Sequence, residues 1–142
     1  MSGISAGTVF RRWFEEVWNE RRADRIATYL APDGLIHALD ESGADAVGPA
    51  AFQQFFERFL VIFPDMHFTV HEVVEQGDMA AGRWTASVTH TGEGLGVPPT
   101  GKAMTVEGFS MLRAEDGKMV EGWNQWDRMS LAVACRMLVP PS

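Results

Sequence analysis

The sequence is poor in the residues and segments on which several classes of protein depend. Its 142 residues include a single cysteine, Cys135, so no disulfide can form within the chain. Cysteine and histidine nowhere have the spacing of a structural zinc site, and no apolar run approaches the roughly 20 residues that span a bilayer. Residues 1–7 lack the basic and apolar stretches of a signal peptide. We therefore expect a soluble, cytoplasmic protein without a metal site.

Basic residues are also scarce. Twelve lysines and arginines stand against nineteen aspartates and glutamates, which gives a net charge of −7. A negative surface repels phosphate backbones and anionic lipid headgroups, so neither nucleic acid nor a membrane is an expected partner. With 46% hydrophobic residues the chain can bury one core, and no linker or repeat divides it. We expect a single domain over residues 1–142.

The apolar pattern predicts helices in the first half of the chain and strands in the second. Helical spacing occupies 5–19, a short segment capped by Asp24, and 49–62. A period near two predicts strands over 34–38, 66–75, 79–91, 103–114 and 119–129. Turn residues join the later strands, which indicates antiparallel hairpins. The order predicts an α+β fold in which a strongly curved antiparallel sheet wraps around the helices and leaves a pocket.

Three polar residues in the strands are candidates for acid/base chemistry. Asp127, close in sequence to two tryptophans, would be a desolvated carboxylate with a raised pKa, as suits a general base, or would cap the strand end or pair with Arg128 or Arg83. His37 lies between apolar residues and would hold a carbonyl group, move a proton, or bond to the backbone. Glu107 interrupts an apolar strand and would be a pocket acid or lie on the wet face of the sheet.

Alternation along residues 119–129 divides the last strand between two faces. Asn124 and Trp126 share one face, and Trp123 and Asp127 share the other, unless a bulge intervenes. Aromatic rings can wall a pocket for a flat apolar ligand. The candidates for such walls are Trp18, Trp84 and Trp123.

An ordered set of short motifs runs along the chain. His37 follows PDGLI, FPD follows the long predicted helix, residues 89–102 read THTGEGLGVPPTGK, and residues 116–127 read DGKMVEGWNQWD. Over roughly residues 9–127 this set resembles the SnoaL-like polyketide cyclase family of the nuclear-transport-factor-2-like superfamily. The resemblance implies a cone-shaped α+β barrel with a deep pocket, usually dimeric. It also implies ring closure by intramolecular aldol condensation without a metal or cofactor.

The resemblance also assigns positions within the site. The catalytic aspartate of the cyclases falls on Asn124, and a histidine of the cyclase pocket falls on Ser110. His90 matches the threonine-histidine pair of the family, where it would face the pocket mouth or hold the glycine-rich loop. Asparagine can hydrogen-bond a carbonyl or an enolate, but it cannot exchange a proton near neutral pH.

Three functional interpretations follow from the sequence. The first is a cofactor-free enzyme that performs aldol cyclisation, isomerisation or hydrolysis on a small apolar or aromatic carbonyl compound. Its base would be Asp127 or His37, and its substrate contacts would come from Asn124, His90, Glu107, Ser110 and the tryptophans. The second is a binding protein that holds an apolar ligand unchanged. The third is a dimeric scaffold whose sheet face binds another protein.

Overall fold

The computed structural model describes residues 3–137, and the chain begins with helices. Ser5 caps the first helix, its hydroxyl accepting a hydrogen bond from the Thr8 N–H at 3.2 Å. Asp24 does not act as the predicted cap; its carboxylate pairs with Arg22 at 3.2 Å. The helical elements that precede β3 (His67–Gln76) in the chain are α1 (Ala6–Arg12), the π-helix η1 (Trp13–Asn19), the 3₁₀ helix η2 (Ala23–Arg25), α2 (Ile26–Tyr29) and α3 (Gly48–Ile62).

Six strands form one sheet in the order β2-β1-β6-β5-β4-β3. Their bounds are β1 (Leu30–His37), β2 (Ala46–Val47), β3 (His67–Gln76), β4 (Met79–Thr89), β5 (Ala103–Glu115) and β6 (Lys118–Trp126). All neighbours pair antiparallel except β1 and β6, which run parallel with Ile36 opposite Gly122. The sheet is therefore mixed, not wholly antiparallel as predicted. Turn residues reveal hairpins between consecutive strands, but β1 and β6 meet only through the tertiary fold.

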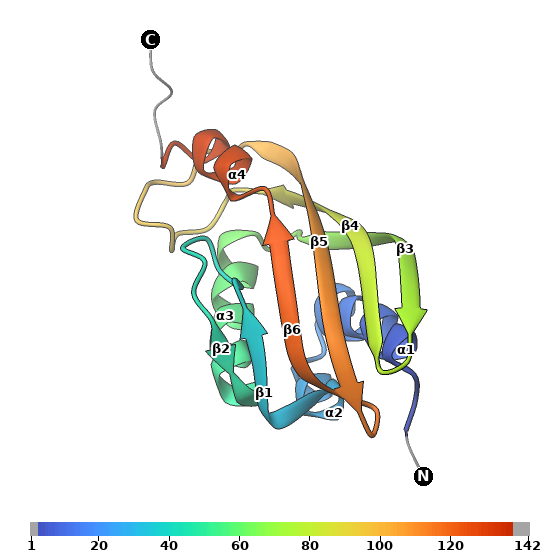
Figure 1. Ribbon diagram of the computed structural model, residues 1–142. Coiled ribbons are helices and arrows are strands. Elements are labelled where there is room, and N and C mark those ends of the chain that lie inside the picture. Colours follow the sequence, from blue (N-terminus) through green and yellow to red (C-terminus); the bar gives the residue numbers. More distant parts are fainter. Residues whose placement is uncertain (1–2, 138–142) are drawn as a thin grey trace.

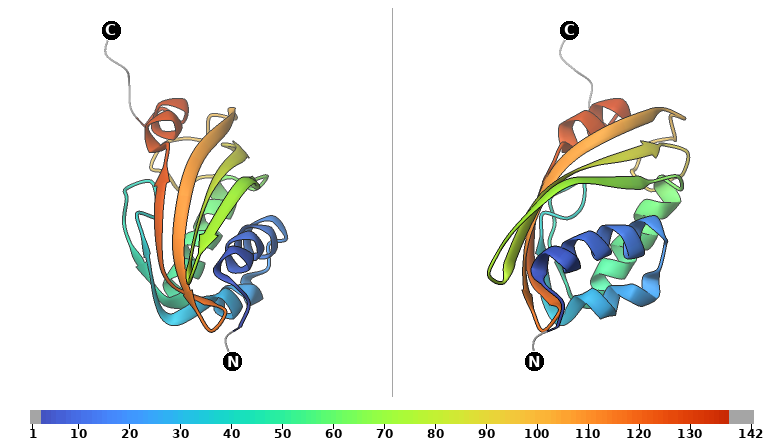
Figure 2. Two further views of the ribbon diagram at one scale, coloured as in Figure 1. Left: turned by 45° about the vertical axis from the view of Figure 1, so that its right-hand side comes forward. Right: turned by 90° about the vertical axis from the view of Figure 1, so that its right-hand side faces the viewer.

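The sheet bends around the helices. Figure 1 shows α1, α2 and α3 on one side of the sheet, and Figure 2 shows the long strands β4 and β5 curving over them. Inward residues alternate with outward ones along β4, as expected for a strand with one buried face. The predicted α+β class is confirmed. No helix within residues 3–137 is long and apolar enough to cross a membrane.

The last predicted strand is too long by three residues. β6 ends at Trp126, and a further helix, α4 (Arg128–Ala134), follows it. Asp127 caps this helix, because its carboxylate accepts hydrogen bonds from the Ser130 N–H at 3.0 Å and the Ser130 hydroxyl at 2.6 Å. Aspartate is a favoured N-cap residue, and its capping contacts here end the strand despite the alternation of the sequence.

Candidate functional site

An apolar pocket of about 90 Å³ lies between the helices and the concave face of the sheet. An engineered protein cavity of about 150 Å³ holds one benzene, so this space holds less than one ring as it stands, and a larger ligand has to displace lining side chains. Aromatic residues from the first helices, α3, β4 and β6 form much of its wall, among them Trp13, Trp18, Phe52, Phe59, Trp84 and Trp126. The apolar spacing over 49–62 predicts a helix with one apolar face, but that pattern does not distinguish a pocket wall from a solid core.

One hydrogen-bonded chain crosses the pocket wall. The Trp84 indole N–H donates to the Ser110 hydroxyl at 2.9 Å, and that hydroxyl donates to Asn124 Oδ1 at 2.6 Å. Asn124 Nδ2 donates to the backbone carbonyl of His37 at 3.0 Å. These contacts fix which way the amide points. The second N–H of Asn124 has no partner within residues 3–137 and is free to donate to a ligand.

The lining contains no ionisable side chain among the residues that the structure describes. Apart from the indole N–H groups, its polar side chains are Ser110 and Asn124. Both were predicted as substrate contacts, and both lie at the pocket with Trp18 and Trp84. The alternation predicted for the last strand agrees with the structure, since Gly122, Asn124 and Trp126 line the pocket.

The side chain of His37 lies on the outer face of the sheet. It stacks on Trp123 with a centroid distance of 5.7 Å, and its Nε2 lies 2.7 Å from Glu121 Oε2. Its Nδ1 lies 3.5 Å from Asp45. The hydrogen bond to Glu121 raises the pKa of His37, and the charge of Asp45 acts in the same direction. His37 and Trp123 are therefore not brought to the pocket, although the His37 carbonyl anchors Asn124.

Asp127 is exposed and lies outside the pocket lining. Hydrogen bonds from the Ser130 hydroxyl and backbone lower its pKa. The prediction of a desolvated carboxylate with a raised pKa is wrong, because Asp127 turns into the helix cap instead of packing on the tryptophans. Asp127 therefore does not contact the pocket.

His90 and Glu107 also lie away from the pocket lining. The His90 ring is fully buried against Phe63, and its Nδ1 lies 3.3 Å from the Thr100 N–H and 3.2 Å from the Thr100 hydroxyl. These contacts correspond to the loop-holding alternative for His90. Glu107 is exposed, and its backbone carbonyl accepts a hydrogen bond from the Asp127 N–H at 3.0 Å. Its carboxylate faces the wet side of the sheet.

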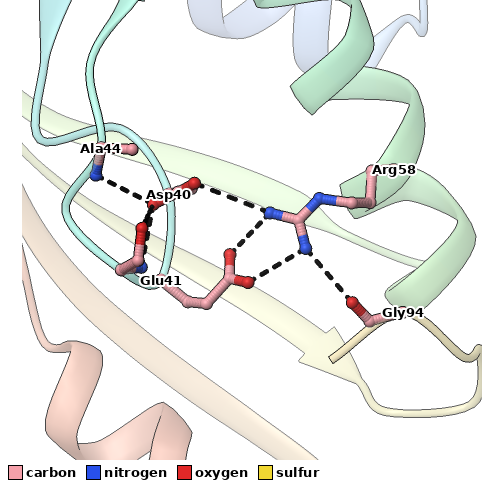
Figure 3. Close-up of polar contacts among 6 residues, drawn as sticks. Asp40, Glu41, Ala44, Arg58 and Gly94 are labelled. Atoms are coloured by element: carbon pink, nitrogen blue, oxygen red, sulfur yellow. Dashed lines mark hydrogen bonds and ion pairs between the residues drawn. The ribbon is translucent and has the colours of Figure 1, made fainter. Parts of the chain in front are cut away.

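Arg58 links two loops beside the pocket. Arg58 of α3 donates to both carboxylate oxygens of Glu41, at 2.7 and 3.0 Å, and to the Gly94 carbonyl at 3.2 Å (Figure 3). Its guanidinium also lies 3.9 Å from Asp40. The neighbouring Leu39 lines the pocket. The loop at 38–45 and the glycine-rich loop at 92–102 are thus both held to α3 at this end of the molecule.

An α+β fold whose curved sheet encloses an apolar pocket with helices is the architecture of the nuclear-transport-factor-2-like proteins. Residues 8–134 match the SnoaL-like polyketide cyclase family, and the chain belongs to this family. The predicted family is confirmed. No curated protein matches the sequence.

Solved structures agree with this assignment. AclR, a candidate hydroxylase from Streptomyces galilaeus, is 28% identical over 95% of this chain and 83% of its own, with a TM-score of 0.79. IdmH, a candidate polyketide cyclase from Streptomyces antibioticus, is 28% identical over 94% of this chain and 97% of its own, with a TM-score of 0.76. A candidate SnoaL-like cyclase from Jannaschia sp. CCS1 is 22% identical over 94% and 92%, with a TM-score of 0.80. The names of these relatives span more than one reaction, so the fold does not determine the chemistry.

Proposed function

We propose that the protein binds a small, flat, apolar carbonyl compound and promotes its ring closure by confinement and hydrogen bonding. The observation that carries this proposal is the oriented amide of Asn124, which lines a largely apolar pocket and has one N–H without a partner within residues 3–137. Family membership supports the substrate class. In this proposal neither Asp127 nor His37 is the base, because their side chains lie outside the lining.

A 1,3-dicarbonyl compound suits such a pocket because it enolises without help and so supplies its own proton. In ring closure the enol carbon forms a carbon–carbon bond to a ketone carbon, and the π electrons of that ketone move to its oxygen. The enol proton ends on the same oxygen, so the product is an isomer of the substrate. The Asn124 N–H stabilises the charge that develops there; one such donor typically contributes about 10²- to 10³-fold in rate.

Ser110 and Trp84 act as positioning residues in this scheme. The Ser110 hydroxyl donates to Asn124 Oδ1, so a ligand can be bound only by the remaining N–H of the amide. The Trp84 N–H in turn orients the Ser110 hydroxyl. The surrounding rings exclude water and limit the conformations of a flexible substrate, which lowers the entropic cost of bringing two carbons together.

The binding step is tested with methyl 6-acetyl-2-naphthoate, a flat neutral ketone, and with methyl 6-ethyl-2-naphthoate, which lacks the ketone oxygen. Asn124→Leu is expected to weaken binding of the ketone about tenfold and to leave the ethyl compound within twofold, because one hydrogen bond is lost. Quenching of tryptophan fluorescence measures both affinities. If Asn124→Leu changes the affinity of neither compound, Asn124 donates to no ligand and the proposal is wrong.

A binding protein without turnover is the second candidate, favoured by the absence of an ionisable side chain from the lining within residues 3–137. An aryl tri-ketone that cyclises slowly in buffer distinguishes the two. Faster formation of the cyclic isomer with protein present supports the enzyme. Retention of the open compound, bound but cyclising no faster than in buffer, supports the binding protein.

We also propose that a second copy of the chain covers the outer face of the sheet. An apolar row crosses this face, where Met111 is paired with Trp123 on one side and with Ala81 on the other, and Ala81 with Val74. Val74 is 69% exposed, and Phe109 in the next row is 61% exposed. Exposed apolar area of this extent on a sheet face is typical of an interface.

The expected result is that wild-type protein is a dimer and that Phe109→Glu is a monomer, since a charge in a packed apolar interface is costly. Light scattering during size-exclusion chromatography measures the mass. Val61→Glu is the matched control, because Val61 is 62% exposed on α3, away from the sheet. A wild-type monomer at about 100 µM, the upper micromolar range in which an obligate interface would be saturated, contradicts this proposal.

A further inference from the structure

Arg128 lies beside two of the residues that line the pocket. Its guanidinium carbon is 5.7 Å from the centre of the Trp126 ring, and its Nη1 donates a long hydrogen bond of 3.4 Å to the Ala38 carbonyl. Trp126 belongs to the pocket wall, and Leu39, next to Ala38, does so as well. The guanidinium therefore lies at the rim of the pocket, between the end of β6 and the loop at 38–45.

The hydrogen-bonding capacity of Arg128 is largely unused. A guanidinium has five N–H donors, and one of them is engaged here. No carboxylate forms an ion pair with Arg128 within residues 3–137, and the adjacent Asp127 carboxylate is occupied by Ser130. Arg58, on the other side of the same loop, is by contrast satisfied by Glu41.

Gly43 lies close to the Arg128 guanidinium and carries no side chain. A Cβ on Gly43 would lie 3.8 Å from the guanidinium carbon and from Nη2, and glycine places no side chain there. The guanidinium lies over the Trp126 ring, and the planar fork of a guanidinium suits a carboxylate. Because the chain carries a net charge of −7, an anion would be repelled without such a local cation.

We propose that Arg128 is a specificity-determining residue that binds a carboxylate on the ligand, so that the pocket accepts flat, apolar keto acids. This inference rests on the proposed function, in which Asn124 binds the ketone. Asn124 and Trp126 are two residues apart on one face of β6, about 7 Å, and the guanidinium lies beyond the ring. The ketone and the carboxylate of the ligand are therefore on the order of 10 Å apart.

The test compares 6-acetyl-2-naphthoic acid, which carries a ketone and a carboxylate at opposite ends, with its methyl ester. Arg128→Gln is expected to weaken binding of the acid about tenfold and to leave the ester within twofold, because a charge-assisted hydrogen bond is lost. Arg128→Lys retains the charge and should recover part of the affinity for the acid. Arg113→Gln, which removes the same charge at a surface arginine near Asp78, is the matched control and should change neither affinity.

A second variant tests the site without removing the arginine. Gly43→Asp places a carboxylate beside the guanidinium, and aspartate tolerates the positive φ of 81° at this position better than most residues. The internal carboxylate should compete with the acid and weaken it about tenfold while the ester is unaffected. Binding of the acid, but not of the ester, should also weaken as salt rises from 0.05 to 0.5 M.

The outcomes separate this inference from the proposed function. If both compounds bind and Arg128→Gln changes them equally or not at all, the carboxylate site is wrong and the ketone pocket stands. If the acid binds and depends on Arg128 while the ester does not bind, the carboxylate site stands and the ketone pocket fails. If neither compound binds wild-type protein, both are wrong.

Discussion

Replacing Gly108 with alanine is expected to lower the free energy of unfolding by about 2 to 3 kcal/mol, the upper range for overpacking a core. Gly108 on β5 is paired with Trp84 on β4, and the indole lies directly over the glycine. An added Cβ would lie 2.3 Å from Trp84 Cζ2 and 2.6 Å from Cη2. The clash forces the buried ring to move. The Phe14 and Phe68 rings pack against it and oppose that movement, so the substitution is costly.

The same substitution should disable the pocket. Displacement of the indole breaks the 2.9 Å hydrogen bond from Trp84 to Ser110, and Ser110 then no longer holds the Asn124 amide. The affinity for methyl 6-acetyl-2-naphthoate should fall about tenfold, the loss of one oriented hydrogen bond. Urea unfolding gives the stability, and tryptophan fluorescence gives the affinity in the folded range.

A double-mutant cycle shows whether the clash is the cause. In a Trp84→Leu background the added methyl group of Gly108→Ala meets a smaller side chain, so its cost should fall to less than half. The same cost in both backgrounds would show that alanine disturbs the backbone of β5 and not the indole. In that case Gly108 would be needed for the bend of the strand.

The glycines within strands and the alternation of β6 show how much of the site could be predicted from the sequence. A glycine inside a strand predicts a bulge or a bend, but the pairing of Gly108 shows no register shift, and the glycine instead allows the Trp84 ring to approach the backbone closely. Alternation places Asn124 and Trp126 on one face, which agrees with the structure, because a strand of nine residues keeps its period of two. The alternation is a local feature that the local sequence determines, whereas the contact of Gly108 with Trp84 depends on the pairing of β4 with β5.

The candidate bases could not be placed from the sequence. His37 lies beside Glu121 only because β1 runs parallel to β6, a pairing between segments more than 80 residues apart. Asp127 follows Trp126 in sequence, yet the chain turns between them and the carboxylate caps α4. Nor does the sequence locate Arg128, whose place at the rim depends on where the loop at 38–45 crosses the end of β6.

Replacing Asn124 with aspartate, the residue that the resemblance to the cyclases implies at this position, is expected to make the stability of the protein depend on pH. When protonated, the new side chain would accept from Ser110 and donate to the His37 carbonyl, as the amide does now at 2.6 and 3.0 Å. When ionised, it would face that carbonyl oxygen without a proton, in an apolar lining. Desolvation and this repulsion both raise the pKa of the aspartate in the folded state.

The sign of the effect follows from proton linkage. A pKa raised on folding gives stability that is fully present below the unfolded value near 4 and is lost as pH rises through the folded value. If the folded pKa lies about two above the unfolded one, the whole contribution is about 2.7 kcal/mol, of which about 2.3 kcal/mol is lost between pH 4 and pH 8. Urea unfolding across this range measures the loss. Wild-type protein and Asn124→Leu are the controls, because neither carries the added proton site.

The same substitution tests whether the pocket can host acid/base chemistry. A carboxylate that titrates near pH 6 inside the lining would act as a general base, so cyclisation of an aryl tri-ketone should accelerate as pH rises through that value. Asn124→Leu should show no such dependence. If Asn124→Asp unfolds in parallel with wild type from pH 4 to 8, water reaches the carboxylate freely. The pocket would then not exclude water around Asn124, and confinement could not be the source of the proposed ring closure.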